Sequence, residues 1–168
     1  MTKSTGLAGL VAAAVLLVAA PFTTPTAVAA EGDADAATKR AQRAIATRQG
    51  ALKLLGFYMG PLGGMARGRI PMDAKIVERN AARIASLAPI VGETFRYDTS
   101  GTDVATEALP VIWTKPNAFA AKSETLLEKA AELGRLARAG DEGAIKGGIG
   151  ALGQACGSCH EDFRVDDD

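Results

Sequence analysis

The sequence predicts an all-α protein folded as an antiparallel four-helix bundle. Hydrophobic residues make up 48% of the 168 residues but aromatic residues only 5%, and alanine is abundant. This composition favours helices, because strands are rich in β-branched and aromatic side chains. Apolar residues recur at helical spacing in four stretches, and no stretch of useful length alternates with the period of a strand. Two short connections and one long connection join the four stretches, as in an antiparallel bundle.

The first helix is expected over about residues 36–59. Its apolar side chains share one stripe with Arg48, and they are Ile45, Leu52, Leu55 and Met59. Gly60-Pro61 and Gly63-Gly64 are expected to stop this helix, because proline removes a helical hydrogen bond and glycine lowers helix propensity. The first connection is then expected to follow this stop.

The second helix is expected to start near Pro71, with Asp73 close to its N-terminus. Its apolar stripe consists of Ile76, Val77, Ile84 and Leu87. Pro89 is expected to end the helix near Ala88, because the residue before a proline is driven out of the helical conformation.

Residues 92–115 form the longest irregular stretch, rich in Gly, Thr, Asp and Pro, and are expected to cross one end of the bundle. The third helix follows Pro116, which suits the first turn of a helix. Ala139-Gly140-Asp141 turns the chain, and Asp141 is expected to cap the fourth helix. The stripe of the third helix is Phe119, Leu126, Ala130, Leu133 and Ala137, and that of the fourth is Ile145, Ile149, Leu152, Cys156, Cys159 and Phe163.

Residues 1–30 are expected to form a cleaved secretory signal peptide. Lys3 gives a positive start, Leu7–Ala20 is an uncharged apolar run, and Ala27-Val28-Ala29 matches the cleavage pattern, so cleavage is expected after position 29 or 30. The alternative is an uncleaved membrane anchor, but the apolar run is too short to span a bilayer comfortably. No other stretch is long and apolar enough to span, so we expect no membrane span in the mature chain.

The folded domain is expected to be residues 31–168. Lys3 is the only charged residue before Glu31, so this domain carries one more acidic than basic residue. Such a balance excludes a strongly basic nucleic-acid-binding surface. Two cysteines and one histidine exclude sites that need many such ligands, including four-cysteine zinc and iron–sulfur centres.

Cys156-Gly-Ser-Cys-His160 is the most specific motif in the chain. C-x-x-C-H is the attachment signature of c-type haem, one per chain. On a helix, Cys156 and Cys159 share a face, so both sulfurs can form thioethers with haem, and His160 can reach the iron from the same side. The alternatives are a redox disulfide, which normally opens a helix after a strand, and zinc, which lacks a second cysteine pair here. Assembly of c-type haem outside the bacterial cytoplasm agrees with export and predicts a periplasmic protein.

The mature chain resembles the cytochrome c′ family of class II c-type cytochromes. The resemblance lies in the C-terminal haem motif with its Cys156–Arg164 ending, in Arg48-Gln-Gly-Ala-Leu52, and in Val111-Ile112-Trp113, where the preceding proline is shifted. It implies a four-helix bundle that holds one haem c. Family members often form homodimers through their first two helices, so a homodimer is expected, with Gly56 and Gly60 permitting close helix contact.

The resemblance also implies how the iron is coordinated. Members with methionine at the position of Leu52 are six-coordinate and low-spin, as in cytochrome c556, whereas members with a non-ligating residue are five-coordinate. Leu52 therefore implies five-coordinate, high-spin iron. Met59 lies two turns further along the stripe, about 10 Å away, too far to replace Leu52. Met65 and Met72 are expected in or after the loop. For all three methionines, a core-filling or loop role is expected.

Three further residues are candidates for the haem site. By resemblance, Arg48 pairs with a haem propionate, and Arg164, one turn beyond His160, lies near the proximal face. Phe57 is a candidate for the lining of the distal pocket, although a plain core role is an equal alternative. Phe163 and Trp113 are expected to be packing residues.

The expected function is a haem protein that binds NO or CO, transfers electrons to an unidentified redox partner, or does both. A vacant apolar sixth position admits small neutral diatomics and excludes bulky or charged ligands. The alternative is a six-coordinate, low-spin electron carrier. An enzyme such as a peroxidase is not expected, because the distal stripe carries no histidine general base.

Overall fold

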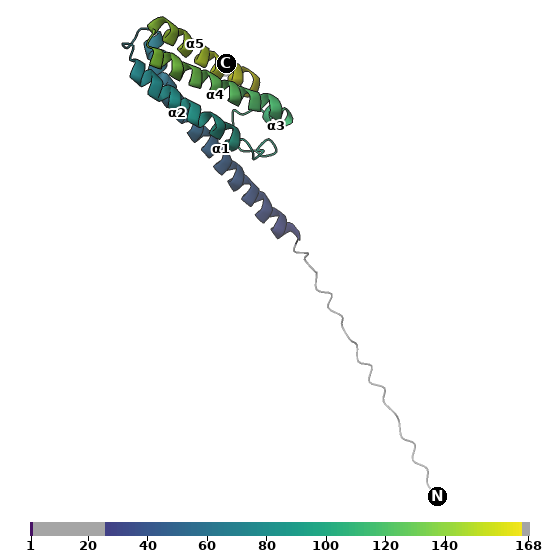
Figure 1. The fold of residues 1–168 in the computed structure, drawn as a ribbon. Coiled ribbons are helices and arrows are strands. Elements are labelled where there is room, and N and C mark those ends of the chain that lie inside the picture. Colours follow the sequence, from purple (N-terminus) through teal and green to yellow (C-terminus); the bar gives the residue numbers. More distant parts are fainter. Residues whose placement is uncertain (2–25, 166–168) are drawn as a thin grey trace.

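The computed structural model describes Met1 and residues 26–165, with side chains from Asp33 onward. The described chain is all-α (Figure 1). Its helices are α1 (Thr26–Ala66), α2 (Ala74–Thr94), α3 (Val111–Thr114), α4 (Pro116–Ala139) and α5 (Glu142–Phe163). The four long helices form the expected bundle, and the one-turn helix α3 was not expected. Most of the expected signal peptide, residues 1–30, lies outside the described residues.

The first helix is longer at both ends than the sequence pattern predicts. Figure 1 shows its N-terminal turns running on beyond the other helices. At the other end, α1 continues through Gly60 and Pro61 to Ala66, so the expected stop at Gly60-Pro61 is wrong. Two features offset the loss of a helical hydrogen bond at the proline. Leu62 and Met65 are buried in the core, and the buried Asn80 of α2 donates its Nδ2–H to the carbonyl of Tyr58, 3.0 Å away.

The end of α2 departs from expectation in the same way. The helix passes through Pro89 and ends at Thr94, not near Ala88. Val91 and Phe95, which follow the proline, are buried, and Ser123 of α4 donates a hydrogen bond to the carbonyl of Ala88, at 2.7 Å. Packing against α4 therefore keeps these turns helical despite the proline.

The last two helices follow the sequence expectation. Pro116 occupies the first turn of α4, and Gly140 ends that helix with a φ of 82°, a left-handed conformation that suits glycine. The Asp141 carboxylate caps α5 by accepting from the Ala144 N–H at 2.7 Å. Within α5, Gly148 allows close approach to α4, because a Cβ there would lie 2.8 Å from Leu136 Cδ1.

Two groups of buried side chains stabilise the bundle. The larger group fills the interior between the long helices and includes Leu62, Val77, Ile84, Leu133, Ile145, Ile149 and Leu152. The smaller group lies at the end of the bundle crossed by the α2–α4 connection and contains Val91, Phe95, Ile112, Phe119 and Phe163. Members of both groups line the pocket described below, among them Ile84 and Leu152 of the larger group and Phe119 and Phe163 of the smaller. None of the described helices is both long and apolar enough to cross a membrane.

Candidate functional site

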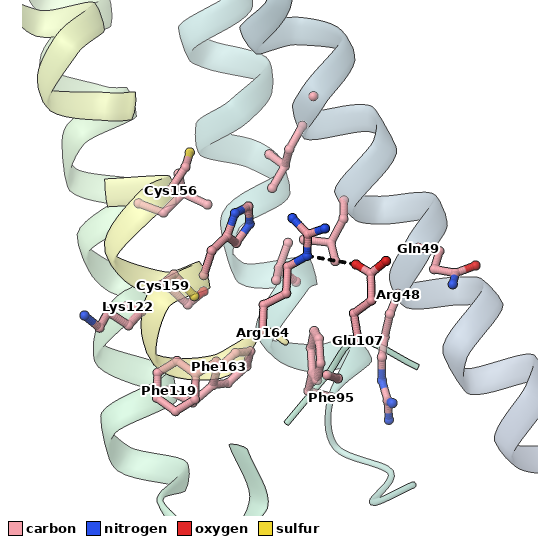
Figure 2. Close-up of a pocket in the computed structure, with 18 of the residues that line it drawn as sticks. Arg48, Gln49, Phe95, Glu107, Phe119, Lys122, Cys156, Cys159, Phe163 and Arg164 are labelled. Carbon is pink, nitrogen blue, oxygen red and sulfur yellow. Dashed lines mark hydrogen bonds and ion pairs between the residues drawn. The ribbon is translucent and has the colours of Figure 1, made fainter. Parts of the chain in front are cut away.

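A pocket of about 520 Å³ lies between α1, α2, α4, α5 and the α2–α4 connection. Apolar side chains from all four long helices line it, together with polar and charged side chains from α1, α4, α5 and the connection. Figure 2 shows Arg48 and Gln49 of α1, Lys122 of α4, and Cys156, Cys159 and Arg164 of the C-terminal segment around this space. Side chains far apart in the sequence therefore meet in one pocket.

The three residues of the haem motif all line this pocket. Cys156 and Cys159 are half-buried on the last turns of α5, both are free thiols, and His160 follows at an exposed position. Burial raises the pKa of both thiols. The positive charge of Lys122 partly opposes this effect on the pKa of Cys159. Within the described residues, no group of three or more His, Cys, Asp or Glu side chains is placed to hold a metal ion.

The distal candidates divide between the pocket and the outside of α1. Leu52 lines the pocket and is 39% exposed, and Met59 lines it as well, where its Cε lies close to Gly153 of α5. Phe57 is not part of the lining: its side chain is 71% exposed and its ring contacts Tyr58 edge-on. The pocket role expected for Phe57 and its alternative, a core role, are therefore both wrong. Met65 lies within α1 and not in or after the loop, and its burial in the core confirms the core role expected for it.

Arg48 is buried, with only 2% of its surface exposed. Its Nε–H donates to the Thr94 carbonyl at 2.9 Å, its Nη1 donates to Thr99 Oγ1 at 2.8 Å, and its Nη2 donates to the Tyr97 carbonyl. Burial lowers the pKa of this guanidinium, although Asp98 opposes the shift. An arginine keeps its positive charge even so.

Arg164 lines the pocket just after α5 ends. Its Nε–H lies 2.8 Å from Glu107 Oε2, as the dashed line in Figure 2 shows. The backbone supports this pair, because Leu109 N–H donates to the Phe163 carbonyl at 3.0 Å and Val165 N–H donates to the Glu107 carbonyl at 2.8 Å. The α2–α4 connection is thus paired with the chain immediately after the haem motif.

Three charged lining residues have no counterpart in the sequence analysis: Lys53, Glu107 and Lys122. Lys122 lines the pocket and forms an ion pair with Asp162 at 2.8 Å. Its spacing from Phe119 and Leu126 places it on the inward stripe of α4, so the sequence pattern could have identified Lys122 as a pocket residue. Glu107 lies in an irregular segment, where no periodic pattern marks a side chain as part of a site.

The family model described as Cytochrome C' matches residues 43–164. The chain belongs to the cytochrome c′ family. Cytochrome c-554 from Cereibacter sphaeroides is 37% identical over 131 residues, which cover 77% of this chain and 85% of the relative. Cytochrome c' from Halomonas halodenitrificans is 38% identical over 127 residues, which cover 73% of this chain and 96% of the relative.

Solved structures of the cytochrome c′ family share the fold. Cytochrome c prime from Shewanella frigidimarina matches with a TM-score of 0.68 and 31% identity, covering 75% of this chain and 97% of that one. The nitric oxide complex of a leucine-to-alanine mutant of cytochrome c prime from Alcaligenes xylosoxidans matches with a TM-score of 0.66 and 25% identity, covering 76% and 97%.

Family membership implies one covalent haem c, and the pocket fits it. The lining is mainly apolar, the two thiols lie on one side with the imidazole next to them, and charged side chains stand among the apolar ones. An apolar pocket with a few convergent polar groups is typical of cofactor sites. Cys156 and Cys159 would hold the porphyrin through thioethers, and His160 would bind its iron.

Proposed function

We propose that this cytochrome c′ family member is a periplasmic haem protein whose five-coordinate, high-spin iron binds NO and CO. The proposal rests on one observation: the pocket contains a single histidine that can bind the iron, and a leucine that cannot. His160 is the only histidine in the chain, and Leu52, which has no lone pair to offer a metal, lines the same pocket. The haem supplies an iron centre that binds small diatomic molecules.

The side chains that line the pocket determine which ligands can reach that iron. Leu52, Leu55 and Leu126 present aliphatic side chains to the pocket, and such a surface disfavours water and charged ligands. A neutral diatomic loses little hydration on entry. Partial exposure of Leu52 leaves its side chain freer to move than a fully buried one, and this supports entry of a small ligand.

We propose ligand binding in preference to catalysis. The only histidine is the expected iron ligand, so no histidine remains to act as a general base on the opposite face. The nitric oxide complex of the Alcaligenes xylosoxidans cytochrome c prime mutant supports the same choice, because that structural neighbour shares this fold.

Electron transfer is the second candidate. It is favoured by one observation, the 37% identity to a relative named cytochrome c-554. An electron carrier benefits from six-coordinate iron, and Met59 is the methionine of this chain that lines the pocket. The state of the sixth position therefore separates the two functions.

The proposal also includes a periplasmic location and a homodimeric state for the protein. The leader-like residues 1–30 and the haem motif together support export to the periplasm. A homodimer is supported by an exposed stripe on α1 formed by Gly50, Leu54, Phe57 and Pro61, in which Leu54 is 48% and Phe57 71% exposed. Nothing lies within 4 Å of a Cβ built at Gly50, so that side of the helix is open. Gly56 lines the pocket and lies off this stripe.

The test is a ligand titration of the purified, exported protein. We expect one haem per chain that stays attached after denaturation, and a reduced optical spectrum that changes on addition of NO or CO. A haem-free protein with a Cys156–Cys159 disulfide would refute the proposal. So would a reduced haem whose spectrum does not respond to either gas.

A further inference from the structure

Glu107 and Arg164 bring opposite charges to the same pocket. Both side chains belong to its lining, and Glu107 Oε2 lies 2.8 Å from Arg164 Nε. Figure 2 shows the pair between α5 and α1, with Arg164 extending from the C-terminal segment toward Glu107. The ion pair of Lys122 with Asp162 differs, because Asp162 is not part of the lining. Glu107 therefore adds a negative charge to the pocket where Arg164 adds a positive one.

The backbone keeps these two side chains next to each other. An antiparallel β-bridge joins Ala108, the neighbour of Glu107, to Arg164. The Val165 N–H donates to the Glu107 carbonyl at 2.8 Å. An exposed ion pair is weakened by the freedom that its side chains lose, and a fixed backbone lowers that cost. These bonds use backbone atoms, so the two side chains remain neighbours when the pocket is filled.

The surroundings of the pair allow its charges to act inside the pocket. Only 36% of the Arg164 side chain is exposed, and the lining around it is mainly apolar. Apolar surroundings screen a charge less than water does. The Arg164 N–H also donates to the His160 carbonyl at 2.9 Å, so this arginine follows the expected iron ligand by one helical turn. A charge at this position therefore lies close to the iron site.

Charge near a haem changes how readily its iron is reduced. Reduction adds one electron, so a positive charge nearby favours the reduced state and a negative charge opposes it. The guanidinium of Arg164 by itself raises the reduction potential, and the carboxylate of Glu107 offsets that effect.

We propose that Glu107 is a positioning residue of the haem site, which holds Arg164 beside the haem motif and compensates its charge there. The reduction potential is then lower than Arg164 alone would set it. The inference rests on the proposed function only in placing haem in this pocket. Because CO binds reduced iron, Glu107 also influences how much of the protein is ready to bind this gas.

The alternative is that the pair only links the α2–α4 connection to the end of α5. Removal of either partner would then disturb the same link, and both changes would move the potential in the same direction. If charge is what matters, removal of the carboxylate raises the potential and removal of the guanidinium lowers it. The signs of the two shifts therefore separate the two roles.

The test is the reduction potential of the haem-loaded protein, measured at neutral pH in a set of variants. Glu107→Gln removes the negative charge and keeps the shape, Arg164→Gln removes the positive charge, and a double variant removes both. Arg164→Lys keeps the charge but not the planar guanidinium. Glu78→Gln is the matched control, because Glu78 pairs with Arg138 at 3.1 Å and both lie outside the pocket lining.

We expect Glu107→Gln to favour reduction by roughly threefold to tenfold and Arg164→Gln to disfavour it by a similar factor, the size expected for one partly screened charge. The double variant should return close to the wild-type potential, because the two charges are removed together. Arg164→Lys should change the potential far less than Arg164→Gln, and Glu78→Gln should not change it. Hydrogen exchange of the Val165 amide should stay at the wild-type rate in Glu107→Gln, because its bond is to the backbone.

Two results would overturn the inference. One is a shift of the same sign in Glu107→Gln and Arg164→Gln, which would make the pair a structural link. The other is a wild-type potential in Glu107→Gln. Failure of the proposed function shows elsewhere, in the response of the reduced spectrum to NO and CO, so the two failures are distinguishable.

Discussion

Leu52 occupies the position in the pocket on which ligand access depends. Its side chain lines the pocket and has no atom that can bind iron. Leu52→Ala removes the steric block and leaves a cavity. We therefore expect CO to bind the reduced protein faster, on the order of tenfold, the factor that about 1.4 kcal/mol of barrier gives. Stopped-flow mixing of the reduced protein with CO measures this rate.

Leu54→Ala is the control for this prediction. Leu54 lies on the same helix, is 48% exposed, and is absent from the pocket lining. Its truncation should leave the CO rate unchanged. Equal rates in wild type and Leu52→Ala would mean that Leu52 does not limit access to the iron.

For single residues, the sequence predicted which side chains attach the haem better than it predicted which residues surround them. Local spacing alone identifies Cys156, Cys159 and His160 as a haem motif, and all three line the pocket. The partners of Arg48 could not be predicted, because they lie some fifty residues away, at the end of α2 and in the irregular segment that follows it. The prediction for Phe57 was wrong because of its place in the helical repeat. Leu55 and Met59 line the pocket, and a residue midway between them lies on the opposite side of the helix.

The helices show how packing overrides local signals. Both Gly60-Pro61 and Pro89 are strong stop signals, yet each lies inside a helix, because the turns beyond it bury side chains in the core. A single sequence shows that a proline destabilises a helix, but it does not show how much tertiary contacts stabilise the turns that follow. Pro116, Gly140 and Asp141 were read correctly, because capping depends on adjacent residues alone.

Asn80 tests this explanation for α1. Its amide donates to the Tyr58 carbonyl in the turn that precedes Pro61, and its side chain is buried. Asn80→Ala leaves that carbonyl without the bond and should lower the free energy of unfolding by about 1–3 kcal/mol. Denaturant unfolding followed by circular dichroism measures the change. Asn117→Ala, at an exposed position of α4, should have almost no effect, and equal losses in the two variants would contradict the role of Asn80.

For the whole molecule, the exposed stripe on α1 predicts self-association. Large apolar side chains are seldom left in contiguous exposed groups unless a partner covers them. We expect the haem-loaded protein to have the mass of two chains by light scattering after size exclusion, and Phe57→Glu to shift it to one chain. Lys53→Glu is the control, because it also introduces a glutamate on α1 but in the pocket lining and not on the exposed stripe. This variant should remain dimeric. A wild-type mass of one chain would remove the proposed dimer.

The central claim concerns the sixth position of the iron, and the most direct measurement is spectroscopy of the resting protein. Electron paramagnetic resonance of the ferric form and resonance Raman scattering of the ferrous form report spin and coordination. With His160 as the only histidine and Leu52 in the pocket, both should show high-spin, five-coordinate iron. Low-spin signals with methionine bound in both states would contradict this account. Such a result would point to Met59 at the iron and would make electron transfer the leading function.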